Sequence, residues 1–204
     1  MSASAAPVLT DRSDFRNVTA SGARLGAFTG AVVVVFLVVS RLVSPGVARE
    51  VVQALVVLVA APLVSLLPAR WTAPRSIEGI AGAAAVGLVG TVVFSAIDIV
   101  ILRPFHAYPW TWDAVGGGST WWYLPIWWML GTFVAWMGGM LSATRAARGP
   151  ATFAQLATPL VASAVIVTIV ARLAGCPVIL PVMVGAVYAL TLTVLAVAGI
   201  ARKG

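Results

Sequence analysis

The chain alternates long apolar runs with short polar segments that are rich in proline, glycine and arginine. Six of these runs approach or exceed the length of about 20 residues that an α-helix needs to cross a bilayer. None shows the period-two alternation of a transmembrane β-strand. The pattern predicts an all-α membrane protein, a bundle of about six transmembrane helices at residues 25–43, 51–67, 77–102, 120–141, 154–171 and 177–200.

Polar and proline-containing segments set the expected boundaries. Residues 1–23 predict a polar cytoplasmic tail, and 24–204 a single transmembrane domain with a Trp-rich extracytoplasmic loop at 103–119. Pro68 predicts the end of the second helix, because proline has no amide hydrogen to donate. Pro177 suits the first turn of the sixth helix. An alternative for the last two helices is a re-entrant pair, with the termini on the same side as before.

Composition supports the membrane interpretation. The chain has 204 residues, of which 61% are hydrophobic and only 9% are charged. Soluble domains carry about 25% charged residues. The net charge of +7 does not indicate a nucleic-acid partner, because the thirteen basic residues lie between apolar runs and form no patch.

The basic residues are unequally distributed between the two sides of the predicted bundle. One side, which includes both termini, holds nine of the thirteen. The positive-inside rule therefore predicts a multi-pass protein of a bacterial plasma (inner) membrane with both termini in the cytoplasm. The four basic residues expected on the outer side are Arg41, Arg49, Arg103 and Arg172.

Small residues recur every four positions on several predicted helices and therefore share one helix face. In lipid there is no hydrophobic drive between helices, so their association depends on close packing and hydrogen bonds. We expect these faces to pack inside the bundle, with docking of a partner subunit as the alternative. The glycines expected at such contacts are Gly26, Gly30, Gly79, Gly87, Gly131, Gly139 and Gly185.

Asp98 is the only acidic residue well inside a predicted span, and it continues the small face of the third helix. A charge in the membrane costs about 3 kcal/mol or more, which makes Asp98 a functional candidate. The alternative is a structural hydrogen bond or ion pair. Arg103 lies five residues on, about 140° around an α-helix. We therefore expect the partner of Asp98 to come from another segment, such as Arg172 or Arg41.

The outer loop and the start of the fourth helix carry the most distinctive pattern. Seven of the eight tryptophans lie between residues 104 and 136. Tryptophan favours the headgroup layer, which predicts an aromatic belt, and a wall for a flat hydrophobic ligand or a partner helix is the alternative. The residues of this belt or wall are Trp110, Trp112, Trp121, Trp122, Trp127 and Trp128.

The same loop contains His106 and Asp113, which join Asp98 and Arg103 as candidates for binding a ligand or an ion. The spacing of these residues does not match a known metal site. His106 fits a solvated interfacial histidine, with a single axial ligand to a porphyrin-type pigment as the alternative.

Known catalytic signatures do not occur in the sequence. The expected function is a non-enzymatic integral membrane subunit or scaffold, which packs against other membrane proteins, a second copy or a lipophilic cofactor such as a pigment or lipid. One alternative is a small transporter or substrate-capture component that uses Asp98 and the aromatic loop. Another is an enzyme acting on a lipid-embedded substrate. A polar internal cavity would favour transport, and a solid core with an apolar outer groove would favour the subunit.

Overall fold

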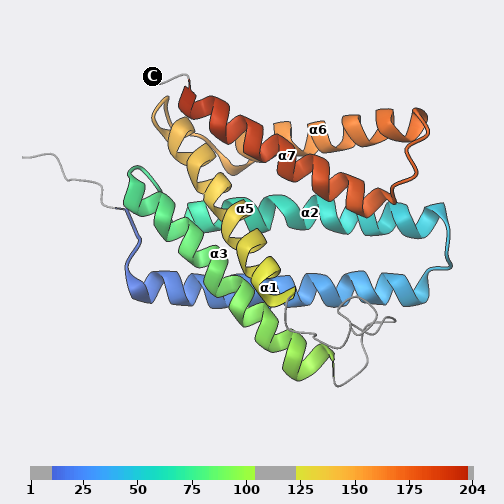
Figure 1. Cartoon of the computed structure of the whole chain (residues 1–204). Helices are drawn as coiled ribbons and strands as arrows, with labels where there is room; N and C mark the ends of the chain where they lie inside the picture. The colour runs from blue at the N-terminus through green and yellow to red at the C-terminus, as the bar shows by residue number, and fades with distance from the viewer. Residues whose placement is uncertain (1–10, 104–122, 202–204) are drawn as a thin grey trace, which may run out of the picture.

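A computed structural model describes residues 11–103 and 123–201, and it has six helices long and apolar enough to cross a bilayer (Figure 1). The described residues contain no strand. The chain is therefore a multi-pass α-helical membrane protein, which confirms the predicted fold class. The helices are α1 (Phe15–Leu42), α2 (Val47–Thr72), α3 (Ile77–Ile97) with its continuation η1 (Asp98–Leu102), α5 (Tyr123–Ala146), α6 (Phe153–Leu173) and α7 (Leu180–Ala201).

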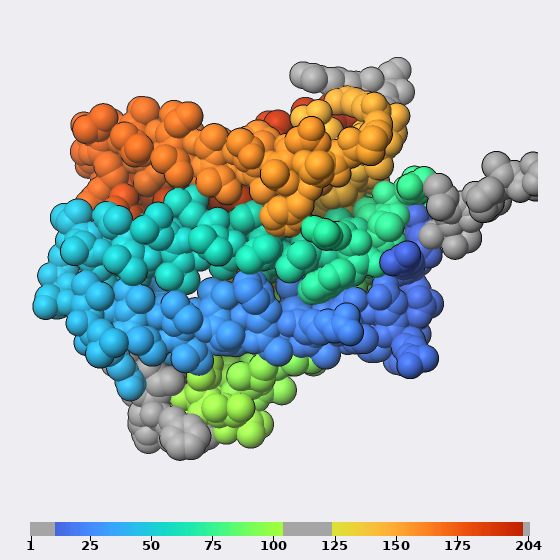
Figure 2. Space-filling model, turned by 180° about the vertical axis from the view of Figure 1, so that it is seen from behind, coloured from blue at the N-terminus to red at the C-terminus, as the bar shows by residue number. Residues whose placement is uncertain are grey.

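The six helices lie in two layers of three. Helices α1, α2 and α6 run side by side, and Figure 2 shows this layer from behind. Helices α3, α5 and α7 cross it obliquely in Figure 1. Helix α2 contacts all the others, whereas α3 packs mainly along α1 and α5. Helix α6 contacts chiefly α7, so it is the most peripheral helix of the bundle.

Two buried clusters hold the layers together. The larger one joins α2, α5, α6 and α7 and includes Leu66, Met137, Leu160 and Leu192. The smaller one joins α1 and α3 through Val18, Leu25 and Val86. Large apolar side chains also cover the outer faces of the helices. This is the distribution that a bundle solvated by hydrocarbon requires.

The first helix begins earlier than its apolar run predicts. Helix α1 starts at Phe15, so residues 15–23 are helical and not part of a polar tail. Asp14 caps this start, because its side chain accepts a hydrogen bond from the amide of Asn17 at 3.0 Å. At 28 residues, α1 is about 42 Å long and exceeds the hydrocarbon thickness of about 30 Å. Its polar first turns therefore extend beyond the apolar core of the bilayer.

Two predictions based on proline were wrong. Helix α2 continues through Pro68 to Thr72 and ends at Ala73, which adopts a left-handed conformation with φ 48°. A proline removes one intrahelical hydrogen bond, and the packing of α2 on its neighbours tolerates this loss. Helix α7 begins at Leu180, so Pro181 occupies its first turn in place of Pro177.

The remaining boundaries differ from the predicted ones by a few residues. Helix α2 starts four residues before the expected position 51, and α5 extends to Ala146, beyond the expected end at 141. Helix α5 is described from Tyr123, three residues after its expected start at 120. Helices α6 and α7 are each long enough to cross the membrane fully.

Candidate functional site

The buried charged pair lies on a single wide turn at the end of α3. The amide of Arg103 donates to the carbonyl of Asp98 at 2.9 Å, which is the i to i+5 bond of a π-helix. Nε of Arg103 lies 3.2 Å from Oδ2 of Asp98. The expectation that Arg103 points away from Asp98 was wrong, because it assumed α-helical rotation. The wider π-turn places residues five apart on one side.

This pair is largely removed from solvent. The side chain of Asp98 is 5% exposed and that of Arg103 is 22% exposed. Among the described residues, Asp98 is the only buried acidic or basic residue. A buried charge is costly in a membrane, and an adjacent opposite charge offsets much of that cost. Arg172 pairs instead with Glu50, at 3.7 Å between Nη2 and Oε2.

A hydrogen bond from a tryptophan supports the same end of α3. Nε1 of Trp128 on α5 donates to Oγ of Ser95 at 3.2 Å. Ser95 in turn donates to the carbonyl of Thr91 at 2.8 Å. The neighbouring Trp127 is 40% exposed. The two tryptophans thus differ in direction: Trp128 binds α5 to α3 one turn before Asp98, and Trp127 faces outward.

Several predicted site residues cannot be placed beside this pair. His106 and Asp113 lie outside the described residues, as do the tryptophans Trp110, Trp112, Trp121 and Trp122. The structure therefore brings Asp98 and Arg103 together, with Ser95 and Trp128 close by. Ser95 was not singled out in the sequence as a site residue.

Glycines allow α3 to approach two neighbouring helices very closely. A Cβ atom on Gly26 of α1 would lie 2.6 Å from the carbonyl oxygen of Gly90. One on Gly87 would lie 2.5 Å from the carbonyl oxygen of Gly131 on α5. One on Gly139 would lie 3.1 Å from Cβ of Ala83. Backbone therefore contacts backbone where α3 packs on α1 and where it packs on α5, and we call these two contacts the seams of α3. At Gly26 and Gly87 the seams leave no room for a methyl group.

Other small-face glycines have different surroundings. A Cβ on Gly30 would make ordinary contact with Ile97 at 3.4 Å, and one on Gly185 with Val57 at 3.6 Å. A Cβ on Gly79 would meet Asp11, which belongs to the segment before α1. Gly138, which was not singled out in the sequence, packs directly on the carbonyl oxygen of Ser65.

The segment before α1 is bound to the start of α3 by Asp11, a residue that sequence reasoning missed. Its carboxylate accepts from the amides of Arg75, Ser76 and Gly79 at 2.9, 3.0 and 3.1 Å, and from the Ser76 hydroxyl. Burial raises the pKa of Asp11, but these hydrogen bonds together outweigh it, and the net pKa is lowered. We call this contact the Asp11 latch.

Two further polar contacts connect distant helices. Oε2 of Glu50, in the first turn of α2, accepts from the amide of Leu180 at 3.2 Å, next to its ion pair with Arg172. The hydroxyls of Ser65 and Tyr188 are 2.8 Å apart between α2 and α7. These contacts fix α7 against α2 at its start and near its middle.

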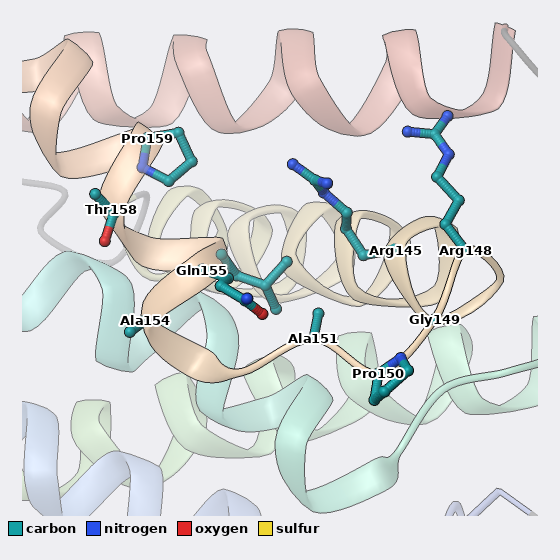
Figure 3. Close-up of a pocket in the computed structure, with 10 residues that line it drawn as sticks. Arg145, Arg148, Gly149, Pro150, Ala151, Ala154, Gln155, Thr158 and Pro159 are labelled. Carbon is teal, nitrogen blue, oxygen red and sulfur yellow. The ribbon is translucent and has the colours of Figure 1, made fainter.

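A hollow of about 640 Å³ lies where α5 ends and α6 begins. Figure 3 shows Arg145 and Arg148 projecting into it from the end of α5, opposite Gln155 and Pro159 of α6. We call it the α5–α6 hollow. It lies at one end of the bundle, away from the Asp98 pair at the opposite end of the helices.

Comparison of the chain with protein-family models, curated proteins and solved structures gives no match. Within the described parts of the chain, no group of three or more His, Cys, Asp or Glu residues is placed to hold a metal ion.

Proposed function

We propose that the chain is a non-enzymatic membrane subunit that packs against other membrane proteins, a second copy or a lipophilic cofactor. The observation that carries this proposal is the tight closure of the described interior. The seams of α3 bring backbone against backbone at Gly26 and Gly87, and Gly138 does the same between α5 and α2. The single buried acid has its counter-charge five residues away. Such an interior suits a rigid packing element.

The same features weigh against a solute pathway between these helices. Alternating access needs a polar site near the midplane between elements that move against each other. Glycine seams with carbonyl contacts resist such movement, because a small separation loses most of their packing. Transport remains the second candidate, since Asp98 and Arg103 lie just before the outer loop.

The decisive experiment isolates the full chain from its native membrane in mild detergent and reconstitutes it in proteoliposomes. We expect a complex of fixed stoichiometry, larger than the 21.1 kDa of one chain, and no solute uptake above that of empty vesicles. A chain that stays monomeric after cross-linking in the membrane and carries no bound lipophilic cofactor would contradict the proposal. Uptake that disappears in a folded Asp98→Asn variant would establish the transporter instead.

We further propose that both termini are cytoplasmic in an inner membrane of bacterial type, which rests on the positive-inside rule. In a Cys176→Ser background, single cysteines at Ser4 and Gly117 should react with an impermeant reagent from opposite sides. Labelling of both from one side would contradict the six-span topology, and exchange of the two sides would contradict the orientation.

A further inference from the structure

The α5–α6 hollow has an apolar arm. A smaller space of about 110 Å³ adjoins it and reaches between α5, α6 and α7. Arg145, Arg148 and Gln155 border both spaces. The apolar residues of the arm are Leu141, Leu156, Pro159, Leu195 and Ala198. The larger space therefore opens into a narrow cleft between helices, in which these apolar residues lie beside Thr144, Gln155 and the two arginines.

The two arginines in the hollow are not neutralised by the described part of the protein. Neither takes part in an ion pair among the described residues, and no acidic residue lines either space. The sequence after Asp113 contains no aspartate or glutamate at all, so α5, α6 and α7 cannot supply a counter-charge.

The acidic residues at this end of the bundle already have partners. Asp11 binds the start of α3, Asp14 caps α1, and Glu78 lies in the first turn of α3, where it shares the hydroxyl of Ser76 with Asp11. Figure 1 places the starts of α1 and α3 at the same end as the α5–α6 connection. Arg145 and Arg148 are both exposed at this end and form no ion pair among the described residues, so they are available to an anion from outside the chain.

We propose that the α5–α6 hollow binds the phosphate group of an anionic phospholipid, with the first part of an acyl chain in the apolar arm. Guanidinium groups match phosphate oxygens with paired hydrogen bonds. Basic residues next to membrane-spanning helices attract anionic headgroups. The first turn of α6 contributes little, because Thr152 and Gln155 already cap it reciprocally. The apolar arm distinguishes a lipid from soluble phosphate, and the proposal is independent of the subunit function.

The test titrates the purified full chain in detergent with phosphatidylglycerol, phosphatidylcholine or inorganic phosphate. Thermal unfolding reports stabilisation, and native mass spectrometry reports retained lipid. We expect phosphatidylglycerol to raise the melting temperature saturably and to be retained, and the other two to have little effect at equal concentration. Equal stabilisation by inorganic phosphate would overturn the lipid as the ligand. Equal retention of phosphatidylcholine would overturn recognition of anionic charge.

Paired variants locate the site. Arg145→Gln with Arg148→Gln should weaken phosphatidylglycerol binding roughly tenfold or more. Arg70→Gln with Arg75→Gln is the matched control, because it removes the same charge at the same end but outside the hollow. Equal weakening in both pairs would overturn a specific site.

Two further variants keep the test decisive if the glutamine pair does not fold. Arg145→Lys with Arg148→Lys retains the charge but loses the planar fork, so binding should weaken partially. Ala198→Phe should fill the apolar arm and weaken lipid binding while both arginines remain. Unchanged binding in both variants would overturn the proposal.

Discussion

The helices before the tryptophan-rich loop and those after it are held together by different means. The first half, α1 to α3, uses carboxylates on helix starts, as in the Asp11 latch, and glycine seams along α3. The second half has no acid of its own. Its helices depend on a core of bulky residues such as Leu160 and Leu192 and on Glu50 of the first half. The comparison shows that the acidic residues of the described helices and their flanking segments all lie in the first half, so that Arg172 of the second half forms its ion pair with Glu50 of the first.

The largest effect is expected where the first half buries its ion pair. Asp98→Asn leaves Arg103 without its carboxylate in a low-dielectric site, and we expect a loss of about 3 kcal/mol in the free energy of unfolding. Adding Arg103→Gln should recover part of the loss. A double-mutant cycle of unfolding in detergent measures the coupling. Additive losses would show that the pair contributes nothing as a pair.

A smaller effect should separate two glycine contacts that join the halves, one between α3 and α5 and the other between α7 and α2. Gly87→Ala places a methyl group 2.5 Å from a backbone oxygen, whereas Gly185→Ala meets only ordinary contact at 3.6 Å. We expect Gly87→Ala to cost about 1–3 kcal/mol through overpacking and Gly185→Ala to be neutral or slightly stabilising. Thermal unfolding of the two variants gives the comparison. Equal stability of the two variants would contradict the closer packing at Gly87.

The Asp11 latch should contribute about 1 kcal/mol, as other caps of helix starts do. The folded pKa of Asp11 is lowered, so its contribution is present above the unfolded value of 3.8. It is lost as the pH falls from that value through the folded pKa. Wild type should therefore lose more stability below pH 3.8 than Asp11→Asn does. If the free energy of unfolding fell equally with pH in wild type and Asp11→Asn, the latch would be contradicted.

An effect as small as that of the latch is expected for the hydrogen bond that joins the halves at Trp128. Trp128→Phe removes the bond to Ser95, and we expect a loss of about 1 kcal/mol. Trp127→Phe provides the control, because Trp127 faces outward. Unfolding of both variants in the same detergent should show the larger loss of stability for Trp128→Phe. Equal losses would mean that the smaller ring, and not the hydrogen bond, causes the effect.

The number and placement of the helices could be read from the sequence, because each span needs a long apolar run. The start of α1 could not, since its first turns are polar and extend past the hydrocarbon. The contact of Asp98 with Arg103 depends on a π-turn that residue spacing does not reveal. The Asp11 latch joins residues more than 60 positions apart. The absence of acids after Asp113, however, was visible in the sequence and was the available signal for an uncompensated basic site.

The long-range hydrogen bonds at the helix ends also determine whether the chain crosses the membrane an even or an odd number of times between the two bonded residues. Asp11 touches Ser76, so the chain crosses an even number of times between them, which α1 and α2 satisfy. Glu50 touches Leu180, and α2, α3, α5 and α6 provide four crossings. If α6 and α7 formed a re-entrant pair, its tip would lie within the bilayer and not at the start of α2, where Glu50 is. These two contacts therefore constrain the path of the chain without reference to the distribution of arginines.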